Sequence, residues 1–97
     1  MKAGDRVLVT GATSGLGAEM ARQLARRGCR VALTGRREDK LREVESAVRS
    51  AGAECLSLLG GVEDPATVKR HYAAIRQAWG GLDAAILNAG EIGRAHV

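Results

Sequence analysis

The stretch TGATSGLG, residues 10–17, decides the fold because of what lies on either side of it. It continues RVLVT, residues 6–10, a β-branched apolar run with the length and composition of a buried strand. After it, small and apolar residues recur at helical spacing from Leu16 to Arg27, and Gly28 then ends the helix. A glycine triplet alone is weak evidence, but a glycine loop between a strand and a helix predicts a dinucleotide-binding β-α-β unit.

Each glycine of the loop has its own expected task. Gly11 permits the tight turn off the strand, and Gly15 lacks a Cβ, so a pyrophosphate can approach the backbone. Gly17 lets the helix pack closely on the strand. The free N–H groups and the positive dipole end of the helix would then face the phosphates. The alternative is a glycine-rich turn that binds no ligand.

The rest of the chain repeats the alternation of short apolar runs and amphipathic stretches. Further strands are expected at residues 31–34, 54–59 and 82–88, and further helices at residues 38–49 and 65–79. The order β-α-β-α-β-α-β indicates an α/β fold with a parallel sheet and right-handed crossovers. We therefore predict the N-terminal half of a doubly wound parallel Rossmann sheet, with strand order 3-2-1-4.

The last helix and the last strand carry the clearest expectations about the core. Asp64 can cap the free N–H groups of that helix, and Pro65 suits its first position. The run AAIL, residues 84–87, is expected to be the buried part of the last strand. The large apolar side chains of the helix fall on one stripe, which we expect to pack in the core: Val68, Tyr72, Ile75 and Trp79.

Composition excludes several classes of function. The chain has 97 residues, enough for one small domain or part of a larger one, and a net charge of +4. With two aromatic residues and no long basic run, we expect no nucleic-acid partner. Cys29 and Cys55 lack metal-ligand spacing, and no segment approaches the roughly 20 apolar residues of a membrane span. We expect a soluble cytoplasmic protein with no metal site.

A second motif lies at the expected last strand. Residues 82–90 read LDAAILNAG, and the glycine loop reads TGxxxGxG. Together the two segments resemble the short-chain dehydrogenase/reductase family, in its compact single-domain branch. Two motifs at this separation and in the right elements are more specific than either alone, and the resemblance covers residues 5–90.

The resemblance implies a binding role for both motifs. The glycine loop would line the pyrophosphate and ribose of the cofactor, Asn88 would tie the central sheet together, and Ala89 and Gly90 would run past the adenosine side. The candidate cofactor-binding residues are Gly11, Thr13, Ser14, Gly15, Leu16, Gly17, Arg36, Arg37, Val62, Asn88, Ala89 and Gly90.

Two positions depart from the family pattern. Leu87 stands where the family usually has an Asn, a change that a buried strand tolerates. Gly61 stands where the family usually has an Asp that bonds the adenine amino group. Glycine cannot make that bond, so we expect weaker adenine binding, with Val62 left to contact the ring.

The end of the second strand favours NADP over NAD as the cofactor. NAD-binding domains place an acidic residue there for the ribose 2′-hydroxyl, but this chain has Gly35 followed by Arg36 and Arg37. Arginine can make charge-assisted bonds to a 2′-phosphate, and the Ser14 hydroxyl can add another. The alternative is that both arginines are merely surface residues at the start of a helix.

The resemblance also implies the reaction: hydride transfer between a nicotinamide cofactor and a small-molecule carbonyl or alcohol substrate. The family's catalytic Tyr, Lys, Ser and Asn all lie downstream of the fourth strand. Tyr72 precedes that strand and has no Lys four residues later, so we assign no catalytic residue to this chain. We expect the chain to be the NADP-binding part of a larger, homo-oligomeric oxidoreductase, and inactive alone. The alternative is a short, non-catalytic NADP(H)-binding protein.

After Gly90 the family pattern is lost. Residues 91–97, EIGRAHV, can be back-translated to a DNA sequence that matches a common short-read sequencing adapter in all but its first base. We therefore expect two parts: a dinucleotide-binding half-domain at residues 1–90, and a non-native tail at residues 91–97 from adapter read-through.

Overall fold

The computed structural model describes residues 1–88 of the chain. Its four strands form one parallel sheet in the order β3-β2-β1-β4, so the predicted α/β fold and strand order are confirmed. The elements follow one another as β1 (Arg6–Thr10), α1 (Gly15–Arg26), β2 (Arg30–Gly35), α2 (Glu38–Ser50), β3 (Cys55–Leu59), α3 (Pro65–Trp79) and β4 (Ala84–Leu87).

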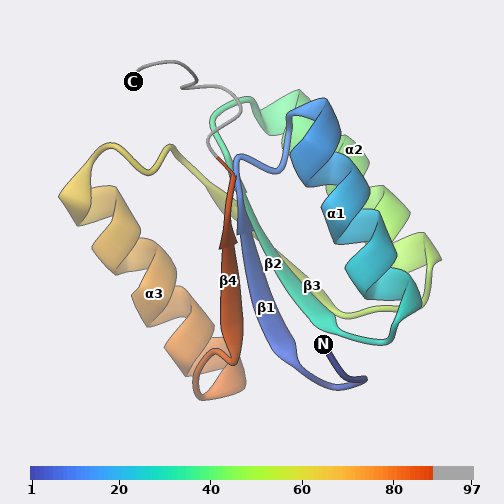
Figure 1. The fold of residues 1–97 in the computed structure, drawn as a ribbon. Helices are drawn as coiled ribbons and strands as arrows, with labels where there is room; N and C mark the ends of the chain where they lie inside the picture. Colours follow the sequence, from blue (N-terminus) through green and yellow to red (C-terminus); the bar gives the residue numbers. More distant parts are fainter. Residues whose placement is uncertain (89–97) are drawn as a thin grey trace.

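The helices cover the sheet from two sides. α1 and α2 lie on one face and α3 on the other (Figure 1). All four strands run in the same direction, so their carboxyl ends meet at one edge of the sheet. The loops that leave β1, β2 and β3 and the end of β4 therefore gather at that edge, which is where open α/β sheets bind their ligands.

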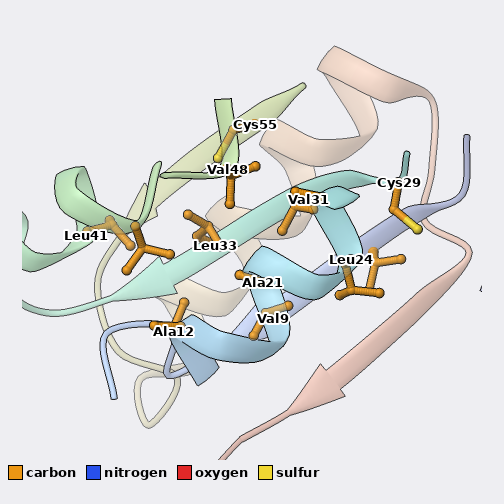
Figure 2. Packing of buried hydrophobic residues seen from close by; sticks show 14 residues of the cluster. Val9, Ala12, Ala21, Leu24, Cys29, Val31, Leu33, Leu41, Val48 and Cys55 are labelled. Carbon is orange, nitrogen blue, oxygen red and sulfur yellow. The ribbon is translucent and has the colours of Figure 1, made fainter. Parts of the chain in front are cut away.

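The larger core lies between the sheet and the pair α1 and α2 (Figure 2). Val9, Val31 and Leu33 point from the strands toward Ala21 of α1 and Val48 of α2, and all five are fully buried. Alanine at the helix surface lets α1 approach the sheet closely. Burying branched side chains of this kind stabilises the fold by about 1.5–3 kcal/mol each.

The α3 face of the sheet has a smaller core, which takes in Ile75 and Trp79 of the apolar stripe expected on α3 but not Tyr72. Leu8, Ala32, Leu58 and Ile75 are buried together, with Trp79 packed against them. The buried residues of α3 are Thr67, His71 and Ile75, whereas Tyr72 is 43% exposed. The row of buried residues begins at Thr67, one residue before Val68, where the expected apolar stripe begins.

Tyr72 is exposed because its neighbour His71 makes a polar contact that apolar periodicity does not reveal. Nε2 of His71 lies 3.1 Å from the carbonyl oxygen of Leu59 at the end of β3, so the histidine faces the sheet. Turning His71 inward places Tyr72, the next residue of the helix, about 100° around the helix axis and toward solvent.

β4 is shorter and less buried than expected. Ala84 and Ile86 pack against the larger core, but Ala85 and Leu87 on the other face are exposed, Leu87 at 75%. Within residues 1–88, β4 pairs with β1 alone and forms one edge of the sheet. An edge strand that packs on one face shows the alternation of a half-buried strand instead of a continuous buried run.

β4 begins two residues later than expected because Asp83 is engaged with β1. Its carboxylate accepts bonds from the Arg6 guanidinium, from Nε at 3.0 Å and from Nη2 at 3.1 Å. The Arg6 amide nitrogen donates to the same carboxylate at 2.7 Å. These bonds join the amino end of β1 to the loop before β4.

Over residues 1–88, no helix combines the length and the apolar character needed to cross a lipid bilayer.

Candidate functional site

The glycine loop follows β1 at the carboxyl edge of the sheet, and two of its glycines are required by packing. Gly11 has φ +60°, and a Cβ there would lie 2.5 Å from the carbonyl oxygen of Asn88. A Cβ on Gly17 would overlap the Gly11 carbonyl oxygen and lie 2.7 Å from Nδ2 of Asn88. These two positions have no room for a side chain because the end of β4 lies directly against the loop.

Gly15 differs from these two glycines. Apart from its chain neighbours and the backbone of its own helix, no atom lies within 4 Å of a Cβ built there, so this first residue of α1 faces open space. Leu16, the next residue, is also exposed. The helix therefore presents its N-terminal backbone to solvent at a position where an anion can approach, as expected for a phosphate-binding helix start.

Ser14 is the N-cap of α1, and its hydroxyl is engaged inside the loop. Oγ accepts from the Gly17 amide at 3.2 Å and donates to the Gly11 carbonyl at 3.0 Å. Oγ also accepts from Nδ2 of Asn88 at 2.7 Å. With this bonding, the hydroxyl stabilises the start of the helix, and a bond to a cofactor phosphate would require it to exchange partners.

Asn88 joins the last strand to the glycine loop. Its Nδ2 donates to the Gly11 carbonyl at 3.0 Å as well as to Ser14, and its backbone N–H donates to Oγ1 of Thr10 at 3.0 Å. Residues 77 positions apart in sequence are thereby held together at the carboxyl edge of the sheet. Ala89 and Gly90, the other two candidates from this segment, lie outside the described residues.

Thr13 explains why position 35 carries no side chain. A Cβ on Gly35 would lie 2.6 Å from Cγ2 of Thr13, so the threonine methyl group occupies the space where a side chain would begin. A side chain at the end of β2 would require the Thr13 side chain to move. The sequence gives no sign of this contact, because it joins the loop after β1 to the end of β2.

Arg36 and Arg37 begin the segment after β2, and both are exposed. Arg37 is the N-cap residue of α2, without a side-chain cap bond. Nη1 of Arg36 donates to Oε2 of Glu63 at 2.6 Å, which links the β2–α2 and β3–α3 loops. No motif in the sequence marks Glu63, which this contact places beside the candidate site.

These loops surround a hollow at the carboxyl edge. Val62 lines it and is itself exposed, and its contact with a cofactor stays a prediction. The residues that line the hollow are Gly11, Thr34, Gly35, Arg36, Gly60, Gly61, Val62, Glu63 and Asn88. The hollow thus combines an exposed apolar side chain, an arginine and a glycine-rich backbone.

Residues 1–88 contain no group of three or more His, Cys, Asp and Glu side chains that could hold a metal ion. Burial raises the pKa of the Cys55 thiol to about 11, so this cysteine is in the protonated form at neutral pH. His71 is buried beneath the β3–α3 loop.

The model of the short chain dehydrogenase family matches residues 5–97 of the chain. This chain belongs to that family. The resemblance inferred from the two motifs is therefore confirmed. Proteins of the family are oxidoreductases. The match extends over residues 91–97, and the expectation that they form a non-native tail stays a prediction, because they lie outside the described residues.

Relatives and solved structures agree with this assignment. Glucose 1-dehydrogenase from Gluconobacter oxydans is 44% identical over 89 residues, which are 91% of this chain and 34% of that protein. The chain is similar to L-sorbose reductase from Gluconobacter frateurii, solved with NADPH and L-sorbose, at TM-score 0.86 and 30% identity over 92% of this chain and 34% of that one.

A metagenomic short-chain oxidoreductase solved with NADP is also similar, at TM-score 0.81 and 34% identity, over 87% of this chain and 38% of that one. The chain therefore spans about a third of the length of the relatives it matches.

Proposed function

We propose that this chain supplies the NADP-binding part of an oxidoreductase that transfers hydride between a nicotinamide cofactor and a small-molecule carbonyl or alcohol substrate. One observation carries the proposal: the open start of α1 at Gly15 and the guanidinium of Arg36 lie at the same edge of the sheet. Two separate phosphate-binding features suit a cofactor that carries both a pyrophosphate and a 2′-phosphate.

The described residues fit such a cofactor group by group. Backbone N–H groups of the first turn of α1 would hold the pyrophosphate, and Arg36 and Arg37 would hold the 2′-phosphate. Val62 would contact the adenine ring. Gly35, above which the Thr13 methyl group lies, presents no carboxylate that would repel the 2′-phosphate. The structures solved with NADPH and NADP support this choice of cofactor by similarity.

The cofactor and the described residues would have different roles in the reaction. When bound, NADP supplies the hydride chemistry through its nicotinamide ring. The described residues bind and orient the cofactor, and we assign none of them to proton transfer. We therefore expect the 97-residue chain to oxidise no NADPH when it is mixed with a panel of carbonyl compounds. Turnover that copurifies with the chain and disappears in Gly15→Asp would overturn this part of the proposal.

Calorimetric titration of the chain with NADP tests the binding site. Aspartate at the first position of a helix suits the dipole, so Gly15→Asp should leave the fold intact. Its charge would face the pyrophosphate, so we expect binding to weaken by about tenfold or more. The control is Ser46→Asp, which adds the same charge on the exposed side of α2. Equal effects of the two substitutions, or no binding by the unmodified chain, would contradict the proposed site.

A further inference from the structure

Glu63 and Arg36 lie 27 residues apart in sequence and are in direct contact beside the candidate site. Nη1 of Arg36 donates to Oε2 of Glu63 at 2.6 Å. A Cβ built on Gly61 would overlap Oε1 of Glu63, so the carboxylate occupies the space that a side chain at position 61 would fill. The guanidinium proposed to bind the 2′-phosphate is therefore already bound to a carboxylate.

We propose that Glu63 is a specificity-determining residue whose carboxylate competes with the 2′-phosphate for Arg36. The inference rests on the proposed NADP site and goes beyond it, because it concerns how strongly that site selects its cofactor. A 2′-phosphate must either displace Glu63 from the guanidinium or share it. Either event has a cost: displacement breaks an ion pair, and sharing places two anions side by side.

A ribose with a free 2′-hydroxyl meets no such cost, because it brings no charge to the pair. Glu63 therefore reduces the preference for the phosphorylated adenosine and leaves binding of the unphosphorylated one unchanged. The Arg36 and Glu63 side chains are 52% and 53% exposed. An ion pair this open to solvent is worth up to about 1 kcal/mol, which corresponds to a change in affinity of about twofold to fivefold.

The test compares two probes that differ in one group: adenosine 2′,5′-bisphosphate and adenosine 5′-monophosphate. Their dissociation constants are measured by calorimetry with the 97-residue chain. Glu63→Gln keeps the size of the side chain and removes its charge. We expect this variant to bind the bisphosphate about twofold to fivefold more tightly and the monophosphate as before.

Two further variants separate the local effect from changes in overall charge. Glu43→Gln removes the same charge from the exposed side of α2, and we expect it to change neither constant. Arg36→Met removes the group for which the two anions compete, so adding Glu63→Gln to it should give little further gain. The side-chain Nε–H signal of Arg36 in NMR spectra should also shift with the bisphosphate and not with the monophosphate.

The possible outcomes separate a failure of the role given to Glu63 from a failure of the proposed NADP site. If the unmodified chain does not prefer the bisphosphate and Arg36→Met changes nothing, the proposed NADP site is wrong and the inference falls with it. If the preference exists but Glu63→Gln weakens bisphosphate binding or leaves it unchanged, only the inference is overturned. An equal gain for both probes, or an equal gain in Glu43→Gln, overturns it too.

Discussion

The side-chain amide of Asn88, at the end of β4, donates a hydrogen bond to the carbonyl oxygen of Gly11, 3.0 Å away in the turn after β1. The same nitrogen reaches the Ser14 hydroxyl that caps α1. One side chain thus fixes the position of the glycine loop against the sheet and holds the start of the helix in place. The shape of the candidate phosphate site depends on this link.

Asn88→Ala should therefore destabilise the fold. The substitution removes two hydrogen bonds from the partly buried loop, to the Gly11 carbonyl and to the Ser14 hydroxyl. At about 0.5–1.5 kcal/mol for each bond, the loss of unfolding free energy should be about 1–3 kcal/mol. Urea unfolding followed by the fluorescence of Trp79, the single tryptophan, measures the change. Gln77→Ala, which removes an exposed amide from α3, should cost no more than about 0.5 kcal/mol. Similar losses in the two variants would show that the link is unimportant.

Two glycines of the same loop should respond in opposite ways to alanine. A methyl group on Gly17 would overlap the Gly11 carbonyl, so Gly17→Ala should cost about 1–3 kcal/mol through overpacking. Gly15→Ala meets open space in a helical position and should be neutral or stabilise the fold by up to about 1 kcal/mol. The same urea experiment checks both. A loss of stability in Gly15→Ala equal to that in Gly17→Ala would be inconsistent with the loop geometry.

Much of this architecture could be predicted from sequence because its signals are local. The glycine loop, the Asp64-Pro65 helix start and the short apolar runs each mark an element within a few residues, and their order determines the topology. Periodicity failed at Tyr72, because the contact between His71 and Leu59 sets which face of α3 turns inward. The buried row on α3 includes polar residues, which an apolar pattern does not select.

The candidate site was less predictable because its decisive contacts join separate loops. Thr13 meets Gly35 across the sheet edge, and Arg36 meets Glu63 over 27 residues of sequence. No local pattern reports either contact. The backbone features were predictable from spacing, whereas the partners of the charged side chains required the folded structure.

The ion pair between Arg6 and Asp83 should make stability depend on pH. Hydrogen bonds from the Arg6 side chain, followed by one from its backbone N–H, lower the pKa of Asp83 from 3.8 to about 2. Because the folded pKa lies below the unfolded one, the pair stabilises the fold fully above pH 4 or so and loses its effect as pH falls from about 4 to 2.

Asp83→Asn should accordingly lower the melting temperature at pH 7, and its difference from the unmodified chain should shrink between pH 4 and pH 2. Asp39→Asn, on the exposed first turn of α2, serves as the control, since no bond to β1 is lost there. Thermal melts followed by circular dichroism across this pH range test the prediction. A difference that stays constant down to pH 2 would argue against it.

The exposed face of β4 should drive self-association. Leu87 lies beside Tyr72 and Val62 along an apolar hollow, at an edge strand whose backbone can pair with another chain. Leu87→Lys should shift the chain toward monomer in sedimentation velocity runs at increasing concentration. Leu59→Lys is the matched control, because Leu59 is exposed at the other edge among charged side chains, including Glu38 and Arg42. If Leu59→Lys disperses the chain as well as Leu87→Lys, association does not depend on β4.

On the proposed function, the loop edge of this sheet selects a dinucleotide by its 2′-phosphate. Calorimetric titration of the chain with NADP and with NAD, before and after Arg36→Met, tests it most directly. Charge-assisted bonds contribute about 1.5–3 kcal/mol, so we predict a preference for NADP of about tenfold to a hundredfold, most of which Arg36→Met removes. Equal affinity for the two cofactors, or tighter binding of NAD, would show that this edge does not select the 2′-phosphate.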